Sequence, residues 1–154
     1  MYLLDTCVCV DFMRGRLPSA RQIFASEPPN SFKIPAIVAA ELYYGAERST
    51  RPEATHRSVA AFLSPFDIVA FDATCTFAYG NIRSALERAG QSLGHNDLLI
   101  AATALANQAI LVTNNVGEFK RVPGLSLESW YETELPHLSD GSAPNRHARA
   151  SECV

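Results

Sequence analysis

The sequence predicts an α/β protein of three layers, an α/β/α sandwich in which helices cover both faces of a central, mostly parallel sheet of four to five strands. Short apolar runs bounded by turn residues alternate with longer segments of helical periodicity, as expected for repeated strand–helix–strand units. The 154 residues, 47% hydrophobic and 19% charged, are enough for one domain with a sizeable core.

The expected strands are short and apolar, and most of them are followed by a polar or turn residue. The first run, Tyr2-Leu3-Leu4, leads directly into Asp5, and a later run leads into Asn114 and Asn115. The last strand is expected at the edge of the sheet. Strands are predicted over residues 2–4, 32–35, 67–71, 109–113 and 125–127.

The expected helices are bounded by caps, glycines and prolines. We expect Ser19 and Asp72 to cap the N-termini of two helices, and Gly90 to adopt the left-handed conformation that ends the second of them. Helices are predicted over residues 8–13, 19–26, 36–47, 51–63, 72–89 and 96–107. The buried stripe of the long fifth helix is expected to contain Phe77, Ile82, Ala85 and Leu86.

The end of the chain differs from the rest in composition. From about residue 134 it is rich in Ser, Ala, Pro, Asn and Arg and loses its periodicity, so we predict a folded domain over 1–133 and a disordered tail over 134–154. No apolar run is long enough to cross a membrane, and the four cysteines form neither a zinc motif nor a disulfide framework. We therefore expect a cytoplasmic protein without a membrane partner.

Three acidic residues stand in apolar surroundings. Asp5 follows the first strand, Glu41 lies within a helix between Ala40 and Leu42, and Asp97 opens the most apolar helix. Ligands of open α/β sheets bind beyond the carboxyl ends of the strands, where Asp5 is expected. A buried carboxylate without a partner is costly, and no Lys or Arg is adjacent to any of the three in sequence.

A divalent cation bound by all three acids would offset this cost. Oxygen ligands select Mg²⁺ or Mn²⁺ over zinc. Each acid also has a simpler interpretation when it is taken alone. Asp5 could cap the helix that follows it, Asp97 could interact only with the dipole of its helix, and Glu41 could be half exposed. The joint placement of the three favours the metal site.

The same residues carry a family resemblance. Four stretches, in the same order along the chain, resemble the motifs of PIN domains in VapC-type toxins. These are residues 4–6 (LDT), 40–46 (AELYYGA), 94–102 (GHNDLLIAA), and 112–115 (VTNN) with 118–119 (EF) and 122–125 (VPGL). The likeness extends over about residues 1–130 and implies a PIN-like version of the predicted sandwich.

The resemblance also implies an activity and partners. It implies the toxin of a type II toxin–antitoxin system, an endoribonuclease that uses Mg²⁺ or Mn²⁺ to cleave cellular RNA such as tRNA or rRNA. A VapB-type antitoxin would neutralise it, and homodimers and toxin–antitoxin hetero-oligomers are expected. By position, the catalytic and metal-binding residues would be Asp5, Glu41 and Asp97. Asp5 and Asp97 would hold the principal metal directly, and Glu41 would hold it through water or form a second position.

Two positions depart from the family pattern. Cys7 stands where asparagine is common, and Asn115 stands where many PIN domains have a fourth acid, whose charge Glu118 could supply. Thr6 and Thr113 are further candidates, because their hydroxyls could orient the ligating carboxylates. As strand-end threonines they could equally have no such role.

Other interpretations remain at this point. A phosphatase or receiver-like domain also has an acid after its first strand, but it uses a second acid close by and a late lysine or threonine. Here Asp11 is expected within a helix, and no lysine follows the late strand directly. A non-enzymatic PIN domain that only binds RNA or a protein is the other alternative, supported by Cys7 and Asn115. The net charge of −3 gives no overall basic field for holding RNA, so a local groove would be needed.

Overall fold

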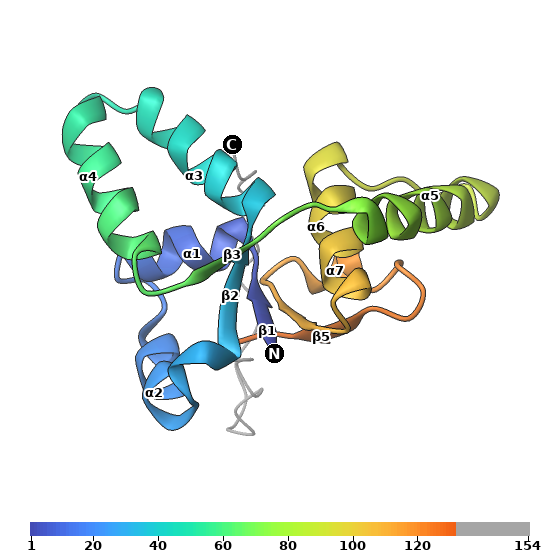
Figure 1. Cartoon of the computed structure of the whole chain (residues 1–154), viewed down its shortest axis with the longest axis horizontal. Coiled ribbons are helices and arrows are strands. Elements are labelled where there is room, and N and C mark those ends of the chain that lie inside the picture. The colour runs from blue at the N-terminus through green and yellow to red at the C-terminus, as the bar shows by residue number, and fades with distance from the viewer. Residues whose placement is uncertain (132–154) are drawn as a thin grey trace, which may run out of the picture.

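The fold was examined in a computed structural model, which describes residues 1–131. A parallel sheet runs through the middle of the molecule, with helices on both sides (Figure 1). The predicted disordered tail over 134–154, and the domain boundary at 133, lie outside the described residues. None of the helices in the described part is long and apolar enough to cross a membrane.

The sheet has five strands in the order β3-β2-β1-β4-β5, and every neighbouring pair is parallel. This confirms the predicted sheet, including the position of the last strand at its edge. The third and fourth strands are shorter than predicted. The strands are β1 (Tyr2–Leu4), β2 (Phe32–Pro35), β3 (Asp67–Val69), β4 (Ile110–Val112) and β5 (Ser126–Glu128).

The direction of strand addition reverses beside β1. Strands β2 and β3 are added on one side of β1, and β4 and β5 on the other. The chain connections therefore leave β1 and β4 in opposite directions, which opens a crevice at the carboxyl ends of these two strands. Asp5 follows β1, and Thr113 follows β4.

In Figure 1, helices α1–α4 lie to the left of the sheet and α5–α7 to the right. Most of the helix boundaries agree with the predicted ones within two residues, and α7 was not predicted. The helices are α1 (Thr6–Met13), α2 (Pro18–Ser26), α3 (Ala36–Glu47), α4 (Pro52–Leu63), α5 (Ala73–Arg88), α6 (His95–Ala106) and α7 (Val116–Phe119), with a short 3₁₀ turn at Pro29–Ser31.

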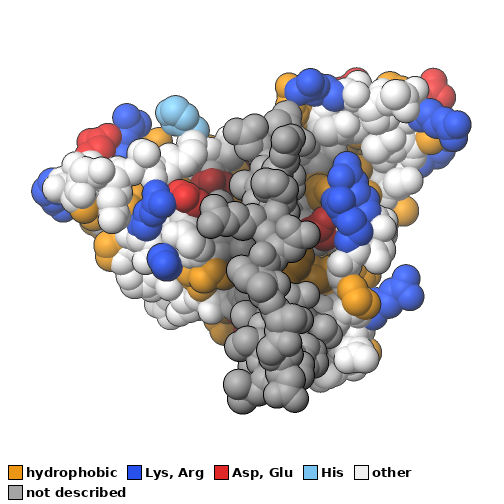
Figure 2. Space-filling model, turned by 180° about the vertical axis from the view of Figure 1, so that it is seen from behind, with side chains coloured by type: hydrophobic (Ala, Val, Ile, Leu, Met, Phe, Trp, Pro, Cys, Tyr) orange, Lys and Arg blue, Asp and Glu red, His pale blue; other side chains and the backbone are white. Residues whose placement is uncertain are grey.

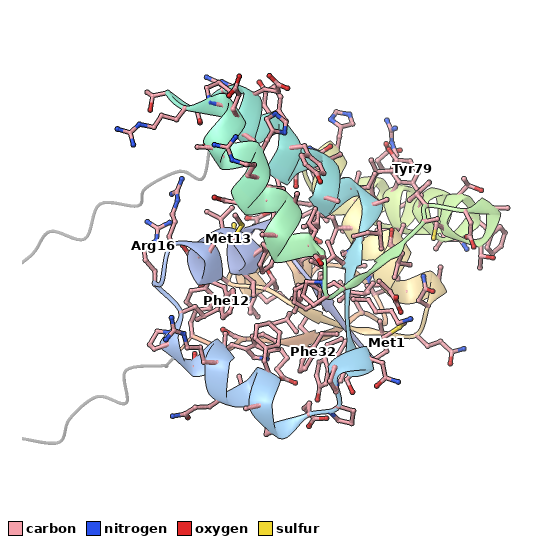
Figure 3. All side chains as sticks on the ribbon, turned by 60° about the vertical axis from the view of Figure 1, so that its left-hand side comes forward. Met1, Phe12, Met13, Arg16, Phe32 and Tyr79 are labelled. Atoms are coloured by element: carbon pink, nitrogen blue, oxygen red, sulfur yellow. The ribbon has the colours of Figure 1, made fainter. Side chains whose placement is uncertain are left out.

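The core of the protein is built around the neighbouring strands β1 and β4, because helices cover both faces of the sheet there. Leu3 and Leu111 are completely buried and are register partners across β1 and β4. On the side of α1 and α2, aromatic rings pack in series: Phe12 against Phe24 at 5.1 Å, and Phe24 against Phe32 at 4.9 Å between ring centroids. Figure 3 shows Phe12 and Phe32 among the side chains between these helices and the sheet.

The predicted N-cap at Ser19 is wrong. Helix α2 begins one residue earlier, at Pro18, and its N-cap residue Leu17 makes no side-chain cap hydrogen bond. Proline suits this position because the first helical N–H has no partner within the helix. The Ser19 hydroxyl instead donates to the carbonyl oxygen of Trp130 at 2.6 Å. It therefore ties α2 to the end of the described chain.

The predicted burial of Phe77 is also wrong, since its side chain is 74% exposed. The buried stripe of α5 is formed by Cys75, Ile82 and Leu86. Phe77 precedes Ile82 by five residues, which places it about 140° around the helix from that stripe. Asp72 and Gly90 end this helix as predicted: the Asp72 carboxylate accepts from two N–H groups, and Gly90 has φ +65°.

Candidate active site

Asp5 lies at the carboxyl end of β1 and is buried, with 3% of its surface exposed. One carboxylate oxygen accepts from the Thr6 N–H at 2.7 Å, and the other accepts from the Thr113 hydroxyl at 2.6 Å. Asp5 is also the N-cap of α1, which confirms the prediction that it caps the helix that follows it. Capping does not exclude a second role as a metal ligand. Burial raises the pKa of Asp5, the two hydrogen bonds lower it, and the charge of Glu41 raises it.

Glu41 lies on α3, and two polar side chains hold its carboxylate. The Thr6 hydroxyl donates to one oxygen, and the Asn96 side-chain amide donates to the other at 2.7 Å. Thr6 therefore connects Asp5, through its N–H, with Glu41, through its hydroxyl. Asn96, on α6, connects Glu41 with the helix that carries Asp97.

Asp97 lies in the first turn of α6, behind the N-cap Gly94. A Cβ atom at Gly94 would lie 3.3 Å from Asp97 Oδ2, which is tighter than ordinary van der Waals contact. The missing side chain therefore leaves room for the Asp97 carboxylate. Burial, together with the charges of Asp5, Glu41 and Glu118, raises the pKa of Asp97 to about 6. The charges of the other three carboxylates therefore oppose the ionisation of Asp97.

The two predicted auxiliary residues near β4 differ in their placement. Glu118 lies on α7 and contributes to the field at Asp97, but it also pairs with Arg121 at 2.9 Å. Asn115 is the N-cap residue of α7 and is exposed, without a side-chain cap hydrogen bond. Its backbone N–H donates to the Thr113 hydroxyl at 2.9 Å. Asn115 thus supports the site through its backbone.

Asn96 was missed in the sequence, although it directly precedes Asp97. The available signal was its place in the first turn of an apolar helix, where an amide has no role in the core. His95, which directly precedes Asn96, is exposed. In the described part of the chain, no hydrogen bond joins His95 to Asp5, Glu41 or Asp97.

Asp11 lies within α1, as expected, and has partners of its own, which weighs against the receiver-like alternative. Its carboxylate accepts from the Tyr131 hydroxyl at 2.7 Å and pairs with Arg16 at 2.7 Å. Asp11 is therefore already neutralised by other partners. It does not form the acid pair beside the first strand that receiver chemistry requires.

The acids of the site lack a cationic partner from the protein. Within residues 1–131, no Lys, Arg or His forms an ion pair with Asp5, Glu41 or Asp97. Over the same residues, no group of three or more His, Cys, Asp or Glu side chains forms a cage that could hold a metal ion. Mg²⁺ does not require such a cage, because it is usually held by one or two carboxylates together with waters and substrate phosphates. The all-oxygen donor set and the repulsion among the carboxylates fit a bound hard cation.

Comparison with known proteins identifies the family of this chain. The family model described as the PIN domain matches residues 2–125. Ribonuclease VapC2 of Rickettsia felis is 43% identical over 132 residues, covering 84% of this chain and 98% of the relative. The tRNA(fMet)-specific endonuclease VapC of Shigella flexneri is 36% identical over 129 residues, covering 84% and 97%.

Solved structures of VapBC complexes contain chains with the same fold. The VapBC2 complex of Rickettsia felis, bound to a promoter DNA fragment, contains a chain that matches with a TM-score of 0.78 and 43% identity, covering 84% of this chain and 98% of that one. The DNA-bound VapBC complex of Salmonella typhimurium matches with a TM-score of 0.80 and 34% identity, at 84% and 98% coverage. PIN-domain nucleases of the VapC type are generally metal-dependent. The chain belongs to the PIN-domain family and is a ribonuclease of the VapC type.

Proposed function

We propose that this protein is the toxin of a type II toxin–antitoxin system and that it cleaves structured cellular RNA in the cytoplasm. The observation that carries the proposal is the set of carboxylates of Asp5, Glu41 and Asp97, which come from three separate elements. The charge of Glu41 raises the pKa of both Asp5 and Asp97, and none of the three acids forms an ion pair with a cationic side chain of the described residues. Binding RNA alone would gain nothing from clustered negative charge that faces phosphate. In a cleavage centre, a bound cation would offset the repulsion among these acids and would bind the phosphate of the RNA.

We infer Mg²⁺ as the cofactor, with Mn²⁺ as a substitute, because every candidate ligand is an oxygen. When bound, the ion lowers the pKa of water for attack on the phosphodiester and offsets negative charge on the scissile phosphate. Asp5 and Asp97 would hold the ion directly. Glu41 would contribute through water or at a second position, since both of its oxygens already accept hydrogen bonds from Thr6 and Asn96.

The neighbours of the acids fix their orientation. The Thr6 N–H and the Thr113 hydroxyl occupy one site on each oxygen of Asp5, which leaves the remaining lone pairs for a ligand. Thr113 is in turn held by the Asn115 N–H. Such supporting hydrogen bonds fix ligand geometry and tune the affinity for metal. Glu118, oriented by Arg121, would add negative charge near the ion.

The substrate and partners follow from the relatives. A relative named for cleavage of tRNA(fMet) makes tRNA the first substrate to test, with rRNA as the second. The VapBC complexes support a VapB-type antitoxin as the inhibitor and a toxin–antitoxin hetero-oligomer as the resting form. The exposed ring of Phe77 and the apolar groove beside it, between α5 and α6, suit the interface of a homodimer.

The proposal is tested by RNA cleavage with purified protein. Wild type is expected to cleave total tRNA or rRNA when Mg²⁺ or Mn²⁺ is added and to stop in EDTA. Asp5→Asn and Asp97→Asn are expected to abolish cleavage, while Asp11→Asn, which removes an acid outside the site, retains it. Full activity of Asp5→Asn with Mn²⁺ would exclude the proposed mechanism. Binding of RNA that is insensitive to EDTA, without cleavage by wild type, would favour a binding module instead.

A further inference from the structure

One face of α3 leads away from the carboxylates and remains uncovered. Glu41, Tyr44 and Arg48 are spaced by three and four residues, so they lie on the same side of the helix, with Gly45 among them. Arg48, at the C-cap, lies roughly 10 Å along the helix axis from Glu41. We call these four residues the α3 strip. Its first member, Glu41, belongs to the candidate active site, and the other three follow it toward the C-terminal end of α3.

Tyr44 is the most exposed aromatic residue of this strip, with 63% of its surface accessible. The Arg48 guanidinium carbon lies 5.8 Å from the centre of the Tyr44 ring, and Arg48 Nη1 lies 3.4 Å from the Tyr44 hydroxyl. In the described residues, Arg48 forms no ion pair with a carboxylate. An exposed ring with an uncompensated guanidinium beside it offers a stacking surface together with a positive charge.

The neighbouring Tyr43 shows that exposure on α3 is not in itself a sign of a partner. Its ring stacks on His56 of α4, with centroids 5.7 Å apart and an interplanar angle of 24°. His56 in turn pairs with Glu47 at 2.9 Å. Tyr43 therefore joins α3 to α4 and has a structural role. Tyr44, one residue later, has no ring partner of this kind within the described chain.

Gly45 has no role in the fold that explains the absence of a side chain. Its backbone is helical with a negative φ, and a Cβ atom placed there would meet nothing within 4 Å. Glycine inside a helix destabilises it by about 1 kcal/mol relative to alanine. The bare backbone instead leaves open space between Glu41 and Arg48, which suits close approach by a ligand.

We propose that the substrate RNA runs from the carboxylates along the α3 strip, with an unpaired base stacked on Tyr44, a phosphate paired with Arg48, and the strand passing closely over Gly45. The inference rests on the proposed ribonuclease function and adds the path of the substrate. Aromatic rings interleaved with arginine are the usual means of holding single-stranded nucleic acid, because every base has a face for stacking.

The charge distribution supports a local path of this kind. The net charge is −3, and Figure 2 shows Lys and Arg side chains on both the left and the right parts of the molecule, not in one basic field. Attraction for RNA must therefore come from single, well-placed cations. After Arg48 in the chain, Arg51 before α4 and Arg57 within it line a shallow depression together with the acidic Glu53.

The test separates binding from cleavage. In an Asp5→Asn background, binding of a short single-stranded RNA of mixed sequence is measured by fluorescence anisotropy without metal. Tyr44→Leu and Arg48→Gln are each expected to weaken binding about tenfold. Arg48→Gln should also reduce the slope of log affinity against log salt by about 0.7, as for one phosphate contact on a single strand. The matched controls Tyr43→Leu and Arg88→Gln, with Arg88 at the end of α5, should bind RNA like the parent.

A third variant excludes misfolding as the cause. Gly45→Leu is expected to weaken RNA binding while it raises the thermal midpoint, because leucine favours the helix and has room there. Unchanged binding in Tyr44→Leu and Arg48→Gln, while wild type still cleaves RNA, would overturn the path and leave the ribonuclease function intact. Retained RNA binding with loss of self-association would assign the face to a second copy of the chain. No cleavage of RNA by wild type with Mg²⁺ or Mn²⁺ would overturn the proposed function itself.

Discussion

The repulsion among the carboxylates should make Asp97→Asn more stable than wild type when no metal is present. Burial and the charges of Asp5, Glu41 and Glu118 raise the pKa of Asp97 from 3.8 to about 6. The folded state therefore binds a proton that the unfolded state has lost between these two values. Ionisation of Asp97 thus destabilises the fold, and asparagine removes that effect.

The magnitude follows from the size of the shift. About two pKa units at roughly 1.4 kcal/mol each give an upper limit of about 3 kcal/mol. Asp97 is partly exposed, so solvent screening reduces this to about 1.5 kcal/mol. Loss of a favourable charge in the first turn of α6 removes roughly 0.5 kcal/mol. The net gain is about 1 kcal/mol, or roughly 2–4 °C in the midpoint of a domain of this size.

The dependence on pH identifies the cause. The folded-state pKa is raised, so the stability contributed by the neutral carboxyl is fully present below pH 3.8 and is lost as the pH rises through 6. The advantage of Asp97→Asn should therefore be full at pH 8 and absent near pH 4. Urea unfolding in EDTA across this range measures it. Glu53→Gln, at an exposed acid in the first turn of α4, should show no gain at any pH. A loss of stability in Asp97→Asn at pH 8, or an equal gain at pH 4, would refute the reasoning.

The remaining predictions concern the supporting residues. Thr113→Val removes a hydroxyl that donates to a buried oxygen of Asp5, so RNA cleavage should fall about 10–100-fold and the free energy of unfolding by about 1–3 kcal/mol, with Thr113→Ser restoring both; cleavage rates and urea unfolding measure them. Asn96→Ala should lower the cleavage rate, while His95→Ala keeps it within a few-fold; the reverse order would assign proton transfer to the histidine. Phe77→Ser should convert a dimer into a monomer in light scattering without lowering the thermal midpoint of the fold, and an unchanged mass would exclude this face as the interface.

Much of the fold could be predicted because local patterns and burial agree. The Asp72 side chain caps the start of α5, and the left-handed backbone of Gly90 follows its end. The apolar runs of the predicted strands are too short for helices and are typical of buried strands. Ser19 and Phe77 could not be placed in the same way. The partner of the Ser19 hydroxyl lies 111 residues away in sequence, and the exposure of Phe77 depends on which side of α5 meets α6.

The acids of the candidate site could be proposed from the sequence, but their hydrogen-bond connections could not. Asp5, Glu41 and Asp97 attract attention because an acid in an apolar segment is conspicuous in sequence. The bridge from Thr6 to Glu41 and on to Asn96 joins three elements and depends on how α3 and α6 pack together. No spacing along the chain contains that information.

We propose that RNA cleavage depends on a divalent cation that Asp5 and Asp97 hold directly, with Glu41 acting through water or at a second position. Mn²⁺ titration followed by electron paramagnetic resonance measures this directly, because the signal of free Mn²⁺ is lost on binding. Wild type should bind Mn²⁺ at the concentrations that activate cleavage, and Asp5→Asn should bind it at least tenfold more weakly, while Asp11→Asn binds it like wild type. Equal Mn²⁺ binding by wild type and Asp5→Asn would contradict the account.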